Sequence, residues 1–380
     1  EDSRRSLDSI SADSVSSVEV MKAVTPNQDA DSRGGSISLK TRPAYQQKSI
    51  STKIGIETTY ESLVGELGYD MRFSIGGPLN KAKTLGGRLS LGVEKEQEGV
   101  EFTTKDWFRR NVDGESHFAL KELKVNDSRE WNATNELSTS LDLKVSEELH
   151  FFWRGSYRNL TNREERPHFE YRLNVGEYDV IDMDGANVSG VEIEQGFREA
   201  ESEIELLESS IGGEWESGNL EADLKLTYQD ESFSPIDHLN LDFVMSGVDV
   251  RYDLEDPKFP SIEITSDKGF SDAEAFVFED FSIRDRRANE TDSIVSSNFK
   301  WKNVFGNEHL AIRFGAKSRI RDEQINSESS YYDTYSGTGV FSLASVLLSD
   351  PGYDVLMGNY LLDTKADGPL TKSFVAENLD

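Results

Sequence analysis

The sequence has no cysteine in its 380 positions and no run of roughly 18 consecutive apolar residues. The absence of cysteine excludes a disulfide-stapled secreted scaffold, thiolate metal sites and thiol catalysis. The absence of a long apolar run excludes a transmembrane helix. A membrane-spanning β-strand is not excluded, because it needs only about 9–11 residues with every second one apolar.

Motifs that carry chemistry are also missing. The five histidines are dispersed and show neither i,i+4 nor H-E-x-x-H spacing, so we expect no metal site; they are His117, His150, His168, His238 and His309. No G-x-S-x-G sequence and no P-loop occurs. Paired carboxylates are inevitable among 71 acidic residues and carry no information about glycosidase chemistry. We therefore expect no cofactor.

Basic residues are few relative to acidic ones, with 41 lysines and arginines and a formal net charge of -30. Such a surface repels phosphates, so we expect no nucleic-acid partner. The acidic stretch 230–290 is most simply a solvated surface, although it would also suit cations or a hydroxyl-rich ligand. The sequence Asp182 to Gly185 resembles a calcium loop, but Val180 stands where an oxygen ligand is required, so a turn is predicted.

Helical periodicity is scarce, whereas period-two alternation fills the chain after Ser49. Between residues 220 and 228, for example, apolar and polar residues alternate without exception. Strict alternation indicates that the two faces of a strand have different surroundings, one apolar and one polar. The pattern predicts strands at 51–60, 63–75, 85–95, 129–145, 149–160, 203–215, 219–229, 291–302 and 308–320, and a tenth from about Ser373.

After a tight link at Glu61 and Ser62, expected on the external side, the connections between these predicted strands are alternately short and long. The short links are 76–84, 146–148, 216–219 and 303–307, and the long ones are 95–130, 160–203, 229–290 and 321–373. Outer-membrane barrels have short periplasmic turns and long external loops. Long structureless connections are uncommon in compact soluble domains. We therefore favour a transmembrane antiparallel β-barrel over a soluble sandwich.

An ordered succession of signals precedes the first barrel strand. A β-branched strand signal is followed by a basic residue, a Thr-Pro turn, an acidic run, a glycine pair that permits positive φ, and a second alternating strand over 36–41. Its members are Val18, Glu19, Val20, Lys22, Thr25, Pro26, Asp29, Asp31, Gly34, Gly35, Leu39, Thr41 and Arg42. This succession resembles the C-terminal end of the plug domain of TonB-dependent outer-membrane receptors.

The resemblance implies an organisation. Residues 1–48 would be the last part of an α/β plug, and residues 49–380 the first part of a barrel with long extracellular loops. Members of this family are 22-stranded barrels closed by a plug. About nine or ten strands are predicted here, and an open half-barrel is untenable in lipid. We therefore interpret the sequence as part of a longer receptor.

The resemblance also implies that the chain acts in transport in the bacterial outer membrane and is not an enzyme. The partners would be outer-membrane lipid, TonB acting through the plug, and a scarce ligand bound by the external loops. The subgroup that fits best is tied to carbohydrate uptake, with siderophores or vitamins as the other ligand classes. Three tyrosines in the last long loop are candidates for stacking on such a ligand: Tyr331, Tyr332 and Tyr335.

Two other classes of protein fit the same alternation. One is a secreted all-β hydrolase that acts on polysaccharide, with Asp or Glu residues as acid and base. The other is a soluble β-rich binding or surface protein without a transport role. The deciding question is whether the apolar face of the strands contacts lipid or a protein interior.

Overall fold

The computed structural model describes residues 15–21, 36–41, 43–181, 184–258, 260–266, 272–335 and 339–346. These residues form one large antiparallel sheet and a separate two-stranded pair, with only short 3-10 turns beside them. The predicted all-β class is therefore confirmed.

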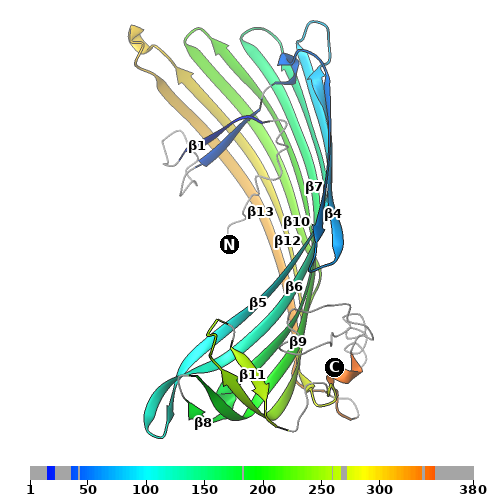
Figure 1. Ribbon diagram of the computed structural model, residues 1–380. Helices are drawn as coiled ribbons and strands as arrows, with labels where there is room; N and C mark the ends of the chain where they lie inside the picture. The colour runs from blue at the N-terminus through cyan, green and yellow to red at the C-terminus, as the bar shows by residue number, and fades with distance from the viewer. Residues whose placement is uncertain are drawn as a thin grey trace.

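The large sheet is a meander in which strands that follow one another in the chain are neighbours (Figure 1). Its nine long strands are β3 (Ser51–Glu61), β4 (Glu66–Pro78), β5 (Leu85–Val112), β6 (Glu115–Lys144), β7 (Leu149–Arg172), β9 (Gly185–Ser217), β10 (Leu220–Asp253), β12 (Val277–Trp301) and β13 (Ile312–Tyr332). Two short strands pair beside them, β8 (Glu177–Ile181) on β9 and β11 (Ser261–Ile264) on β10. Among the described residues, β3 and β13 are the two edges of the sheet.

Each predicted strand from 51–60 to 308–320 corresponds to one of these nine strands, in the same order. The predicted short links are turns at 79–84, 145–148, 218–219 and 302–311, and they lie together at one end of the sheet. We call this the near end, at the top of Figure 1, and the opposite end the far end. The predicted tenth strand at Ser373 lies outside the described residues.

The structure corrects the long connections. Most of 95–130, 160–203 and 229–290 is strand, because the strands continue far past their predicted ends. β5 and β6, for instance, meet in a two-residue turn formed by Asp113 (φ 51°) and Gly114 (φ 82°). Positive φ at both positions is the geometry of a type I′ hairpin turn, which favours Asp-Gly. No long loop separates these two strands.

The strands are also longer than predicted, because they continue past their predicted ends. The expected length was roughly 11 to 15 residues, whereas β5 has 28, β9 has 33 and β10 has 34. At a rise of about 3.3 Å per residue, β10 extends over roughly 110 Å. A membrane needs only about 9–11 residues of a tilted strand, so a bilayer would accommodate no more than about a third of each long strand.

The far half of the sheet has a packed hydrophobic core. Residues 239–252 of β10 supply much of it, and β8, β11 and residues 339–346 pack around them. Phe243 is 1 % exposed, and its ring lies 5.3 Å from that of Phe341. Buried tyrosine hydroxyls join the layers, since Tyr178 donates a hydrogen bond to the Leu120 carbonyl. This half is stabilised by burial like an ordinary water-soluble domain.

The separate pair consists of β1 (Val15–Met21) and β2 (Ser36–Thr41), which are antiparallel with Val18 opposite Leu39. Both strand signals of the plug-like motif are therefore confirmed as strands. The other members of the motif lie outside the described residues: Lys22, Thr25, Pro26, Asp29, Asp31, Gly34, Gly35 and Arg42.

Replacing Phe243 by alanine should destabilise the far half. Truncation of a fully buried phenylalanine removes apolar contacts and leaves a cavity, at a cost of about 3–5 kcal/mol. Amide hydrogen exchange over 239–250 should accelerate accordingly. Phe118→Ala, at a residue that is 64 % exposed in the same half, is the matched control and should leave exchange unchanged. Equal rates in the two variants would contradict the core.

Candidate membrane-facing surface and its polar counterface

The near half of the sheet exposes apolar side chains along one face, without the cover that the far half has. Cross-strand pairing places them side by side: Leu91 is opposite Leu137, and Leu137 is opposite Tyr157. We call this set the apolar band. Its exposed members include Leu89, Leu91, Leu137, Leu141, Leu143, Phe151, Tyr157, Leu207, Ile211, Leu224, Leu226, Tyr228, Val295, Phe314 and Ile320.

The exposure of the band is too large and too continuous for ordinary surface residues. Leu224 is 52 % exposed and Ile211 is 55 % exposed, and both lie in the middle of the sheet rather than at its edge. Contiguous apolar surface of this kind marks an interaction with a protein or a membrane. The stripe on β10 begins at Leu220 and ends at Tyr228, after which Asp230 and Glu231 follow, so its length matches the roughly 9–11 residues of one membrane crossing.

The opposite face of the same strands is polar, and its charges are paired across strands. Arg154 Nη2 lies 2.5 Å from Asp142 Oδ1. The Asp292 side chain is 1 % exposed, and its carboxylate contacts both Arg319 and Arg321. Cross-strand pairs of opposite charge stabilise a sheet face, and here they also neutralise an otherwise buried carboxylate.

The segment between β2 and β3 rests on this polar face. It contains the short 3-10 turn η3 (Ala44–Gln46), where the Ala44 amide donates a hydrogen bond of 2.9 Å to Asp142 Oδ2. The Tyr45 hydroxyl lies 2.6 Å from His150 Nδ1, and the two rings stack with an interplanar angle of 6°. Gly86 makes this approach possible, because a Cβ there would overlap the backbone of Ala44 and Tyr45. The chain is thus fastened to the face that carries the ion pairs.

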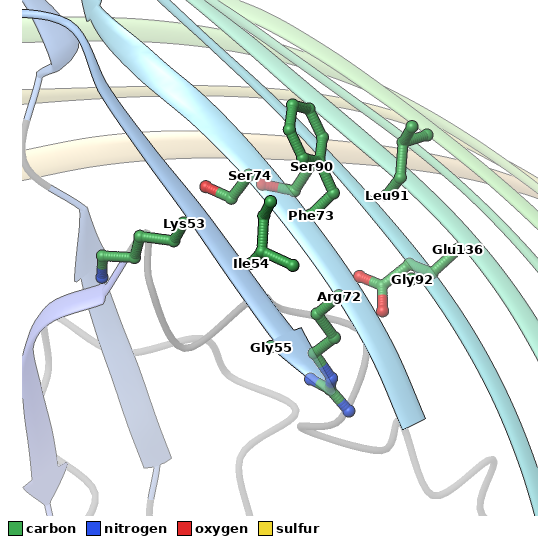
Figure 2. Close-up of a pocket in the computed structure, with 10 residues that line it drawn as sticks. All are labelled: Lys53, Ile54, Gly55, Arg72, Phe73, Ser74, Ser90, Leu91, Gly92 and Glu136. Atoms are coloured by element: carbon green, nitrogen blue, oxygen red, sulfur yellow. The ribbon is translucent and has the colours of Figure 1, made fainter. Parts of the chain in front are cut away.

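A small hollow also opens on the polar face between β3, β4, β5 and β6 (Figure 2). Gly55, Arg72, Gly92 and Glu136 lie in one cross-strand row, so the two glycines leave space beside the charged side chains. The hollow has a volume of about 250 Å³. Ligand pockets usually measure about 300–1,000 Å³. The hollow alone is therefore small for a substrate site.

The tyrosines singled out from the sequence do not share one surface. Tyr331 is 63 % exposed near the end of β13 and is hydrogen-bonded to Asp280. Tyr332 and Tyr335 pack against the far-half core, where the Tyr335 ring lies 5.4 Å from that of Phe341. Of the plug motif, Val20 is 60 % exposed.

The sequence reasoning missed a group of polar residues on the polar face of the far half. His168 of β7, Glu194 of β9 and Asp242 of β10 are all buried and converge there. Burial, reinforced by the charges of Asp242 and Glu279, raises the pKa of nearby Asp280 to about 6. The only signal that could have found this group is strand register, since the three residues come from three separate strands that were predicted to end earlier.

No protein-family model matches the chain, and no curated protein is significantly similar to it. Among the described residues, no helix is long and apolar enough to cross a bilayer.

Gly86→Ala should release the segment around Ala44 and Tyr45 from the sheet. The added methyl group would occupy the position of the segment's backbone, and the hydrogen bond to Asp142, about 1.5–3 kcal/mol for a charged acceptor, would be lost. Trypsin cleavage after Lys48 should then become faster. Gly55→Ala is the control, because its nearest neighbour would lie at 4.0 Å. Unchanged cleavage in Gly86→Ala would contradict the docking.

Proposed function

We propose that this chain is part of a TonB-dependent outer-membrane receptor, which binds a scarce ligand at the cell surface and imports it through a plugged barrel. The observation that carries the proposal is the apolar band on a meandering antiparallel sheet whose opposite face is polar and ion-paired. It supports lipid contact, because the far half buries the same face of the sheet and the near half does not.

Lipid is the solvent that best explains the band. Outer-membrane barrels present alternating strands with the apolar side toward lipid and the polar side toward the lumen. Aromatic residues accompany the near end of the band, including Trp215 and Trp301 next to their turns, where an interfacial girdle would lie. The short turns at 145–148 and 218–219 would then face the periplasm, and the far half would project outside the cell.

The sheet edges limit what the described strands can do alone. β3 and β13 each have one unpaired side within the described sheet, and open edges are not stable in hydrocarbon. The proposal therefore requires further strands between these two edges in the functional receptor. The 22-stranded closure expected from the family resemblance would supply them.

The proposal of a plug domain rests on the sequence motif and on the segment around Ala44 and Tyr45 that is bound to the polar face. The β1–β2 pair precedes η3, and η3 is bound to the polar face, which would line the barrel lumen. A plug inside the barrel must be joined to the first barrel strand along that face. TonB would act on the plug. The ligand class that we propose first is carbohydrate, followed by siderophore or vitamin. For transport itself we propose no cofactor, no nucleic-acid partner and no covalent chemistry.

Fractionation of the source cell tests the proposal. The protein should sediment with the outer membrane and resist extraction by alkaline carbonate, whereas a secreted hydrolase or a soluble binding protein should be released. A deletion strain grown on scarce carbon and iron sources should lose growth on one of them. Recovery of the protein in the soluble fraction would refute transport, and release of reducing sugar from a polysaccharide would favour the hydrolase.

Arginine in place of Leu226 should impair membrane assembly. Leu226 lies in the band beside Ile211 and Val295, and an arginine at the bilayer midplane costs about 2–4 kcal/mol. Gel electrophoresis should show less of the heat-resistant folded protein for this variant than for the wild type.

Asp223→Arg is the matched control on the opposite face of the same strand, where the new cation would lie opposite Glu214. It should assemble far better than the Leu226 variant. Equal assembly of both variants would argue against lipid contact.

A further inference from the structure

Three buried side chains meet on the polar face of the far half. Strand register sets up the meeting: His168 is opposite Gly196, and Gly196 is opposite Asp242. His168 is 8 % exposed, Glu194 is 4 % exposed and Asp242 is 7 % exposed. Gly196 keeps the space between the other two strands open, because a Cβ there would overlap Asp242 Oδ1 and the His168 ring.

The donor atoms of the three residues point at one another. His168 Nε2 lies 3.0 Å from Glu194 Oε1 and 3.2 Å from Asp242 Oδ1, and all three atoms are within 4.8 Å of each other. In a tetrahedral zinc site with bonds of about 2.0–2.1 Å, neighbouring ligand atoms are roughly 3.3 Å apart. The two short separations therefore match the edges of such a coordination polyhedron.

Hydrogen bonds alone do not satisfy this arrangement. Nε2 carries at most one proton, which it can donate well to only one of the two carboxylates. Asp242 Oδ1 is buried and has no hydrogen-bond donor among the described residues. A buried carboxylate oxygen without a donor costs stability. A cation placed between the three atoms would satisfy Oδ1, Oε1 and a neutral Nε2 together.

The remaining carboxylate oxygens are held from outside. Glu194 Oε2 contacts the Arg172 guanidinium, and Asp242 Oδ2 accepts a hydrogen bond from Asn240 Nδ2. Each carboxylate thus has one oxygen fixed by an outer partner and the other directed at His168. Contacts of this kind orient the residues that bind a metal, and their removal typically weakens metal affinity.

We propose that His168, Glu194 and Asp242 form a binding site for a divalent transition-metal ion of the Zn²⁺ class. An imidazole with two carboxylates favours zinc and related ions over calcium or magnesium, which prefer oxygen ligands alone. Asp280 is opposite Asp242 across β10 and β12 but is not one of the three converging residues. The ion would join β7, β9 and β10. This inference departs from the expectation, drawn from histidine spacing, that no metal site is present, and it does not depend on the proposed transport function.

The site can be tested by titrating the purified full chain with Zn²⁺ alone and measuring the binding by calorimetry. One equivalent should bind, and Co²⁺ should give the visible absorption of a tetrahedral site that Zn²⁺ displaces. His168→Ala and the isosteric Asp242→Asn should each weaken binding by more than the roughly 10–100-fold lost with an outer-shell partner. Asn240→Ala should fall within that smaller range.

His309→Ala is the control, because His309 is exposed at the near end. It should bind Zn²⁺ like the wild type. The cobalt spectrum of the unmutated protein keeps the test valid if a variant misfolds. Absence of tetrahedral cobalt absorption, or equal zinc affinity in His309→Ala and Asp242→Asn, would overturn the site and leave a buried ion pair.

Discussion

A continuous antiparallel register, shifted only at local irregularities, is the constraint on which the rest of this structure depends. Side chains in a strand alternate with a period of two, so a face keeps its identity only while the register holds. β7 and β9 pair from Leu149 to Arg172 without a shift. The face that exposes Phe151 at the near end is therefore the face that buries Tyr171 in the far-half core, and the polar face with Arg154 is the one that carries His168.

This continuity explains why one sheet can serve two environments. In the far half, β8, β11 and residues 339–346 cover the apolar face and give it an interior. In the near half, no described segment covers it, and the apolar band lies open. β10 accommodates the change with irregular pairing between Pro235 and Asp237, after which the apolar positions shift from even to odd numbers. A bulge is the expected device for such a change, because it restores the face after one extra residue.

The sequence was informative where the two faces have different surroundings. Alternation located nine strands because each near-half strand has an apolar and a polar side. It failed where both sides are polar, as from Asn126 to Ser128, where strand β6 continues without any alternation to reveal it. The ends of the strands were therefore unpredictable from hydrophobicity. The His168 group was hidden for the same reason, because its members meet only through pairing of those unrecognised extensions, and its glycine partner Gly196 has no local motif around it.

The two polar sites are far enough apart to be independent. His150, which holds Tyr45, and His168 belong to the same strand and are separated by roughly 60 Å at about 3.3 Å per residue. Direct electrostatic interaction over this distance is screened, since the Debye length is about 8 Å at physiological ionic strength. Energetic effects at sites so far apart, with no shared partners, usually add. A metal ion in the far half would thus stabilise the packed core without tightening the docked segment. The position of that segment would remain governed by its hydrogen bonds with Asp142 and His150.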